Sequence, residues 1–392
     1  LYITLEQWDE AQKLLQGNIA GRVEGIQSYL NLAQVYMNRG LIDEAQDVLE
    51  SFLDYVYDNA TIHESLAHNY LWKGEFSLAS VEAEHAFRIE PLHHRNFLLK
   101  GDIRNYLGDL NGTEREYQNL LNTSEPTAHN QGLHRLINLY LFQGRFREAF
   151  EQARHGIELA DLLGEKSWLI DYNLTLASIY FDLDQPDEVL KVCRQAWEAA
   201  EKEGSLEGKR KILLFQGLAY LSMGKINQAE TTAAELKTIC DKYLNKNICR
   251  YHSFLKGKIE HNKQNHPEAV RFLKEALASI PSPYFGRYFW ALLLHSLGQV
   301  YFDSGDLQNA KIQYDVLTAF PQGRVHWGNL YVRGFYMLAK IYDENNIRPM
   351  AVRNYQRFLE LWKNADSNIQ KVAESEERLS ELQMPLSTLI RE

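Results

Sequence analysis

Residues 66–74 read Leu66-Ala67-His68-Asn69-Tyr70-Leu71-Trp72-Lys73-Gly74. Alanines follow at Ala79 and Ala86, and a proline stands at Pro91. Glycine adopts the left-handed conformation at little cost, so Gly74 predicts the end of a first helix. The alanines would let a second helix approach the first closely, and Pro91 suits the first turn of a further helix. The stretch therefore predicts two antiparallel helices joined by a tight turn.

The same pattern recurs along the chain. The turn position is occupied by Gly40, Gly74, Gly108, Gly144, Asp184, Gly224, Gln264, Gly305 and Asn346. The intervals between these positions are 34, 34, 36, 40, 40, 40, 41 and 41 residues. Five residues after each turn stands a compact side chain, at Ala45, Ala79, Thr113, Ala149, Val189, Ala229, Ala269, Ala310 and Ala351. The pattern predicts a repeat array with one continuous core, although 392 residues would otherwise suggest two or three domains.

This order of small residues, ring, glycine and proline resembles the tetratricopeptide repeat family, in which each unit is a helix–turn–helix. The resemblance implies an all-α fold, a right-handed superhelical solenoid of antiparallel helix pairs. The expected parts are the second helix of a truncated repeat (1–20), three repeats of the 34-residue type (21–125), six lengthened repeats (126–363), and a C-terminal capping helix and tail (364–392). The expected core is Ala33, Tyr36, Ala45, Ala67, Tyr70, Ala79, Ala177, Tyr180, Tyr220, Ala229, Tyr301, Ala310, Ala339, Tyr342 and Ala351.

Some local details are also predicted. The second helix of the third repeat is expected from Thr113, because Asn111 and Gly112 are expected to loosen its start. Residues 325–344 are expected to form a single helix.

The two ends of the chain suggest a larger protein. The sequence begins at Leu1 without Met, and Ala11 lies 34 residues before Ala45, so the first helix of that repeat is missing and we expect a fragment. Near the other end, residues 355–366 are similar to the closing repeat of bacterial multidomain signalling proteins. Those proteins carry a tetratricopeptide array after a Ser/Thr kinase, TolB-like or cyclase-type domain.

Composition excludes some functions. The net charge of −10 argues against a nucleic-acid binder, since binding phosphates needs a dense basic surface. No apolar run approaches the ~20 residues that span a bilayer. The three cysteines form no CxxC pair, and Cys193 falls in an expected core position. They favour a reducing compartment, so we expect a cytoplasmic rather than an extracytoplasmic location.

The sequence shows no catalytic motif. His63 and His68 flank a segment that resembles a zinc-binding helix, but they are five positions apart and point in different directions on a helix. Nucleophile-elbow, dinucleotide-binding and P-loop patterns are absent from the sequence. We therefore expect no catalytic residue, no cofactor and no metal in this chain.

The resemblance does imply a binding surface. In the family, first helices line a concave groove that binds extended peptides or helices. Residues one position after the small residue of each first helix are Gln34, His68, Asp102, Asn138, Ser178, Leu218, Lys258, Gln299 and Lys340. Residues five positions after it are Asn38, Trp72, Tyr106, Phe142, Asp182, Ser222, Asn262, Asp303 and Glu344. We call these two sets the groove columns.

Rigid aromatic side chains are common anchors of peptide interfaces, and three follow one another in the second column. We therefore expect a protein or peptide to bind at His68, Trp72, Asp102, Tyr106, His134, Arg135, Asn138 and Phe142. Arg135 is expected to pair with an acidic side chain of the partner. The alternative is that the three rings pack against the first helix of the next repeat.

The sequence leaves several functions open. The favoured hypothesis is a non-catalytic interaction scaffold, part of a larger signalling or regulatory protein. Alternatives are the regulatory or substrate-docking arm of an upstream kinase or cyclase, and the small-molecule sensor of a transcription regulator. A tight apolar pocket would support the sensor. The sequence does not determine the oligomeric state.

Overall fold

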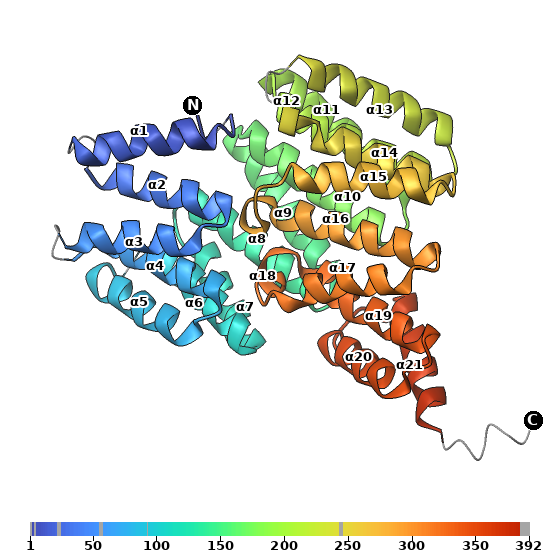
Figure 1. Ribbon diagram of the computed structural model, residues 1–392. Coiled ribbons are helices and arrows are strands. Elements are labelled where there is room, and N and C mark those ends of the chain that lie inside the picture. Colours follow the sequence, from blue (N-terminus) through green and yellow to red (C-terminus); the bar gives the residue numbers. More distant parts are fainter. Residues whose placement is uncertain are drawn as a thin grey trace, which may run out of the picture. The chain divides into compact units, whose positions relative to one another are not determined.

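The computed structural model describes residues 2–3, 5–21, 25–54, 58–91, 93–242 and 246–384. Within these ranges the regular elements are all helical (Figure 1). They are α1 (Trp8–Ala20), α2 (Gly25–Arg39), α3 (Ile42–Leu53), α4 (Ala60–Lys73), α5 (Phe76–Ile89), α6 (His94–Leu107), α7 (Leu110–Leu121), α8 (Pro126–Phe142), α9 (Phe146–Leu163), α10 (Lys166–Asp182), α11 (Pro186–Glu203), α12 (Leu206–Ser222), α13 (Ile226–Asp241), η1 (Lys246–Cys249), α14 (Arg250–Asn262), α15 (His266–Ala278), α16 (Pro283–Asp303), α17 (Leu307–Ala319), α18 (Gly323–His326), α19 (Gly328–Glu344), α20 (Arg348–Leu361) and α21 (Gln370–Gln383).

The chain forms two compact units. The N-terminal unit comprises Leu1–Leu136 together with the short segment Ile280–Arg287, and the C-terminal unit comprises Ile137–Ser279 and Tyr288–Glu392. Inside each unit the helices pack as consecutive pairs, as α4 with α5 and α14 with α15 (Figure 1). The predicted all-α repeat fold is confirmed.

The turn between paired helices is left-handed at every predicted position. Gly74 has a φ of 79°, and the backbone N–H of Glu75 donates to the carbonyl of Tyr70 at 2.9 Å, closing the end of α4. Asp184, Gln264 and Asn346 adopt the same positive φ, at 54°, 61° and 57°. The chain therefore repeats this turn even where it lacks the residue that adopts it most easily.

Gln264 should carry the largest strain of the three, because Asn and Asp tolerate the left-handed region better than Gln. We expect Gln264→Gly to raise the free energy of unfolding by about 1 kcal/mol. Asn346→Gly should give less than half of that gain. Urea denaturation of both variants measures the difference, and a loss of stability in Gln264→Gly would contradict this account.

The compact residues that follow the turns fill the contact between paired helices. All nine, from Ala45 to Ala351, have 0% exposure. The small residues of the first helices also have little room for a larger side chain. For example, a Cβ added to Gly298 would lie 2.5 Å from the Tyr314 ring. The predicted core alanines are buried, and the tyrosines of that set are buried or half-buried.

Two local predictions are wrong. Helix α7 begins at Leu110 rather than Thr113, because the Asp109 carboxylate accepts from the backbone N–H of Gly112 at 2.9 Å and caps the helix. The single helix expected over 325–344 is divided into α18 and α19, with Gly328 at a φ of 33°. Asn111 and Gly112 thus lie inside a capped first turn.

The C-terminal helix α21 packs on α20, as expected of a cap. The Tyr336 hydroxyl donates to Glu374 at 2.7 Å, and Arg378 contacts both carboxylate oxygens of Asp343, at 2.6 and 2.9 Å. Of the helices in the described part of the chain, none combines the length and apolar character needed to cross a membrane.

Candidate functional site

The predicted binding residues of the N-terminal unit meet partners within their own chain. Asp102 is 2% exposed, and both of its carboxylate oxygens accept from Arg135, at 2.9 and 3.0 Å. The buried Tyr117 hydroxyl donates to the same carboxylate at 2.6 Å. The acid that was expected to come from a partner is thus supplied by Asp102, 33 residues before Arg135 in the preceding repeat.

His68 lies beside this pair and is half-buried. Burial lowers the pKa of its imidazole to about 4, and the cation of Arg135 acts in the same direction while Asp102 opposes it. His68 is therefore neutral at physiological pH, so it can orient a ligand through a hydrogen bond but cannot attract an anion by charge. His134, on α8, is also half-buried.

Trp72 is covered by the segment Ile280–Arg287 of the same unit. Its ring meets that of Tyr284 edge to face at a centroid distance of 4.9 Å, and Trp72 is 8% exposed. The Ser282 hydroxyl donates to the carbonyl of Asn38 at 2.8 Å. The Tyr284 hydroxyl donates to the side chain of Gln34 at 3.4 Å. Gln34, Asn38 and Trp72 all belong to the groove columns, so the chain's own segment lies on the predicted surface.

The other two rings also have neighbours inside the chain. Tyr106 stacks on Phe76, with centroids 5.2 Å apart and planes inclined by 12°. Phe142 has 0% exposure in the C-terminal unit, where the guanidinium of Arg324 lies 4.7 Å from its ring centroid. The three rings thus contact parts of their own chain, at Tyr284, Phe76 and Arg324, and none of these residues belongs to the first helix of the next repeat. Asn138, on the same helix as Phe142, is half-buried.

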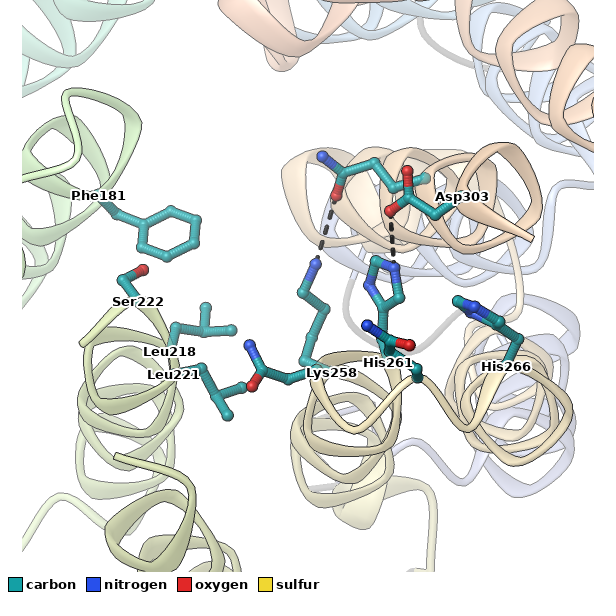
Figure 2. Close-up of a pocket in the computed structure, with 11 residues that line it drawn as sticks. Phe181, Leu218, Leu221, Ser222, Lys258, His261, His266 and Asp303 are labelled. Atoms are coloured by element: carbon teal, nitrogen blue, oxygen red, sulfur yellow. Dashed lines mark hydrogen bonds and ion pairs between the residues drawn. The ribbon is translucent and has the colours of Figure 1, made fainter. Parts of the chain in front are cut away.

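The C-terminal unit contains a cleft along the same columns. Its volume is about 580 Å³, and Figure 2 shows side chains that converge on it from α10, α12, α14 and α16. Six of its lining residues are members of the groove columns: Leu218, Ser222, Lys258, Asn262, Gln299 and Asp303. Phe181, Leu221, His261, Gln264 and His266 complete the lining. First helices thus line a cleft in this unit, as the family resemblance implied.

Lys258 is the most unusual group of the cleft. Its ammonium donates to Gln299 at 3.3 Å (Figure 2), and among the described residues it forms no ion pair. Burial lowers its pKa to about 8; Arg333 adds to this effect and Asp303 opposes it. Asp303 is itself engaged, because His261 Nε2 lies 2.9 Å from its carboxylate.

Charged groups of both signs surround Lys258. Arg333 pairs with the buried Asp182 at 2.6 Å and contacts His295 Nε2 at 3.1 Å. Burial lowers the pKa of Lys371, on α21, and Arg333 lowers it further while Asp182 opposes the shift. Glu374 and Asp184 also raise the pKa of Lys371, so carboxylates balance the cations of this region.

The predicted binding residues lie in the earlier repeats, where aromatic side chains follow one another in the second groove column. They do not include Lys258, although this residue stands in the same column as His68 and Asp102. A lysine at a groove-column position, which faces other first helices, could have identified this residue as a candidate for binding. The pKa shift that distinguishes Lys258 comes mainly from burial, with a contribution from Arg333, 75 residues later, and the repeat pattern predicts neither.

Comparisons with known proteins agree with the repeat pattern. Residues 26–55, a range that includes most of α2 and all of α3, match the family model described as tetratricopeptide repeat. A search of the curated proteins finds no match to this chain.

Solved structures give distant similarity. A Rap protein complexed with competence and sporulation factor is 13% identical, with 83% of this chain and 97% of that chain covered and a TM-score of 0.45. A tetratricopeptide repeat protein from Parabacteroides merdae is 14% identical, with coverages of 83% and 99% and a TM-score of 0.40. The STAND protein PH0952 from Pyrococcus horikoshii, with a tetratricopeptide repeat sensor, is 11% identical, with coverages of 92% and 55% and a TM-score of 0.42. TM-scores below 0.5 carry no inference about the function of this chain.

Proposed function

Because this chain is built of tetratricopeptide repeats, we propose that it is a non-catalytic scaffold whose cleft in the C-terminal unit binds an acidic peptide. The observation that carries the proposal is Lys258, a desolvated ammonium without an ion-pair partner among the described residues. A carboxylate of the partner would complete this pair in a region where water screens charge poorly.

The remaining side chains of the cleft suit an extended peptide. Ser222, Asn262 and Gln299 offer hydrogen bonds to peptide groups, while Leu218, Leu221 and Phe181 offer apolar contact. A small-molecule sensor would be better served by an enclosed apolar pocket. The polar lining favours a peptide ligand over that alternative.

The proposal predicts charge-selective binding. We expect synthetic peptides with acidic residues to bind at least tenfold more tightly than the same peptides with Asp and Glu changed to Asn and Gln. Lys258→Gln should remove this preference, because it removes the charge but keeps a side chain of similar size. Fluorescence anisotropy of labelled peptides measures both effects.

Lys256→Gln is the matched control, since Lys256 lies two residues away on the same helix and already has Glu260 at 4.0 Å. It should change affinity less than twofold. The proposal fails if acidic and neutral peptides bind alike, or if Lys258→Gln and Lys256→Gln have equal effects.

The same binding should depend on pH with a defined sign. In the free protein the pKa of Lys258 is about 8, below its ordinary value of 10.5, and a bound carboxylate would raise it. Above pH 8 binding therefore takes up a proton, so affinity should fall as the pH rises from 7 to 9.5. Lys258→Gln should abolish this dependence.

The part that the scaffold plays in the cell is a further element of the proposal. The similarity of residues 355–366 to the closing repeat of bacterial signalling proteins supports a regulatory role beside an upstream domain. Sequencing the gene upstream of Leu1 tests it: a Gly-rich loop followed by an HRD-type motif would indicate a kinase.

A further inference from the structure

A cluster of possible metal ligands lies in the second full repeat, away from the cleft. His63 is on α4, and Glu82 and His85 are on α5. Each offers one ligand atom, and these atoms lie within 4.8 Å of one another. His63 is 6% exposed, and the other two side chains are half-buried. Within the described residues, no other group of three such side chains meets that distance.

Both hydrogen-bond partners of His63 are acids. Its Nδ1 lies 2.6 Å from a carboxylate oxygen of Glu82, and its Nε2 lies 2.6 Å from a carboxylate oxygen of Asp58. A neutral imidazole has one N–H and can donate to only one of these acids. With both acids ionised, one further positive charge satisfies both contacts, either a proton or a cation between Nδ1 and Glu82.

His85 supplies a further ligand beside Glu82, which favours a metal ion over a proton at this position. Its ring centroid is 5.0 Å from that of His63, so a second imidazole nitrogen faces the space beside Glu82. Two imidazoles and one carboxylate form a ligand set that Zn²⁺ uses with a water molecule in the fourth position. Imidazole ligands also select against Mg²⁺ and Ca²⁺, which prefer oxygen.

The geometry points to a divalent transition-metal site, with Zn²⁺ as its natural occupant, formed by His63 Nδ1, the Glu82 carboxylate and a ring nitrogen of His85. Tetrahedral bonds of about 2.1 Å place ligand atoms roughly 3.4 Å apart, so the contact between His63 Nδ1 and Glu82 would widen by small side-chain rotations to admit the ion. Asp58 then accepts from Nε2–H and fixes the orientation of the His63 ring, as carboxylates do behind many zinc-bound histidines.

The ion would join the two helices of one repeat. His63 lies on α4, the helix that also carries His68 and Trp72 on its groove positions. A bound ion therefore should stabilise the pair α4–α5 and, with it, the N-terminal unit. The sequence motif suggested no metal, because His63 and His68 lie on the same helix and point in different directions, whereas Glu82 and His85 come from the next helix.

The test is direct titration of the full chain after EDTA treatment and dialysis. CoCl₂ should give a visible absorption band that saturates at one ion per chain, and ZnCl₂ should displace the band. The melting temperature should rise with added ZnCl₂. Glu82→Gln and His85→Gln should each lower the affinity for Zn²⁺ at least tenfold and remove the rise in melting temperature.

His155→Gln is the control, because His155 is exposed on α9 and reports adventitious binding by surface histidines. It should bind Co²⁺ like the unmodified chain. Circular dichroism verifies that each variant folds. If a variant does not fold, the Co²⁺ spectrum of the unmodified chain still tests the proposal. The proposal is overturned if the unmodified chain gives no saturable band, or if His85→Gln binds Zn²⁺ as tightly as His155→Gln does. Neither result affects the proposal for Lys258, which concerns other residues.

Discussion

Replacing Asp102 with alanine is expected to lower the free energy of unfolding by about 3–5 kcal/mol, the usual cost of breaking a buried ion pair from one side. The change leaves the guanidinium of Arg135 without the carboxylate that now accepts two of its hydrogen bonds. It also leaves the Tyr117 hydroxyl, in a side chain with 0% exposure, without its acceptor. Urea denaturation followed by circular dichroism measures the loss.

Asp43→Ala provides the matched control. Asp43 also forms an ion pair in the N-terminal unit, with Lys73 at 2.9 Å, but its side chain is 80% exposed. Exposed pairs contribute about 1 kcal/mol or less, so this variant should remain close to the unmodified chain. Equal effects of Asp102→Ala and Asp43→Ala would show that the pair with Arg135 is not buried in solution. Arg135 could then bind a partner as the sequence suggested.

The repeat fold was predictable because its determinants are local and periodic. Each turn depends on a residue that can adopt positive φ, and each helix contact depends on a small side chain at a fixed offset. Asp184, Gln264 and Asn346 illustrate the strength of the pattern: the columns on either side located the turn although no glycine marked it. Their backbone conformation follows from the repeat.

The contacts that define the candidate sites are less periodic, and this explains what sequence reasoning missed. Asp102 and Arg135 are one repeat apart, so their opposite charges could have suggested a pair. Tyr284 and Trp72 are separated by 212 residues, and nothing in the repeat pattern aligns them. The segment from Ile280 to Arg287 begins outside any helix, where the columns predict no contact.

The conformation at the end of this segment is also unusual. Arg287 has a φ of 40° and a ψ of −120°, which interrupts α16 one turn after its start. Non-glycine residues occupy such conformations only when their surroundings hold them there. Ser282 and Tyr284 contact the groove columns, and these contacts hold the segment that ends at Arg287. An experiment on Trp72 can therefore distinguish a residue that packs on Tyr284 from one that is open to a binding partner.

Truncating Trp72 to alanine is expected to cost about 3–5 kcal/mol of folding stability, as removal of a buried tryptophan does. Part of this cost should come from the ring contact with Tyr284. In a double-mutant cycle with Tyr284→Ala, we expect a coupling energy of about 1 kcal/mol, the usual value of an edge-to-face aromatic pair. Chemical denaturation of the two single variants and the double variant gives this value.

Tyr284→Phe is the control, because it keeps the ring and removes only the long hydrogen bond to Gln34. It should change stability by less than about 1 kcal/mol. A coupling energy near zero between Trp72 and Tyr284 would mean that the segment does not lie on Trp72 in solution. In that case Trp72 would be open to a partner, and Trp72→Ala should weaken peptide binding by about 2 kcal/mol, as expected for an interface anchor. With the coupling present, the affinity of acidic peptides for the folded Trp72→Ala variant should instead stay unchanged.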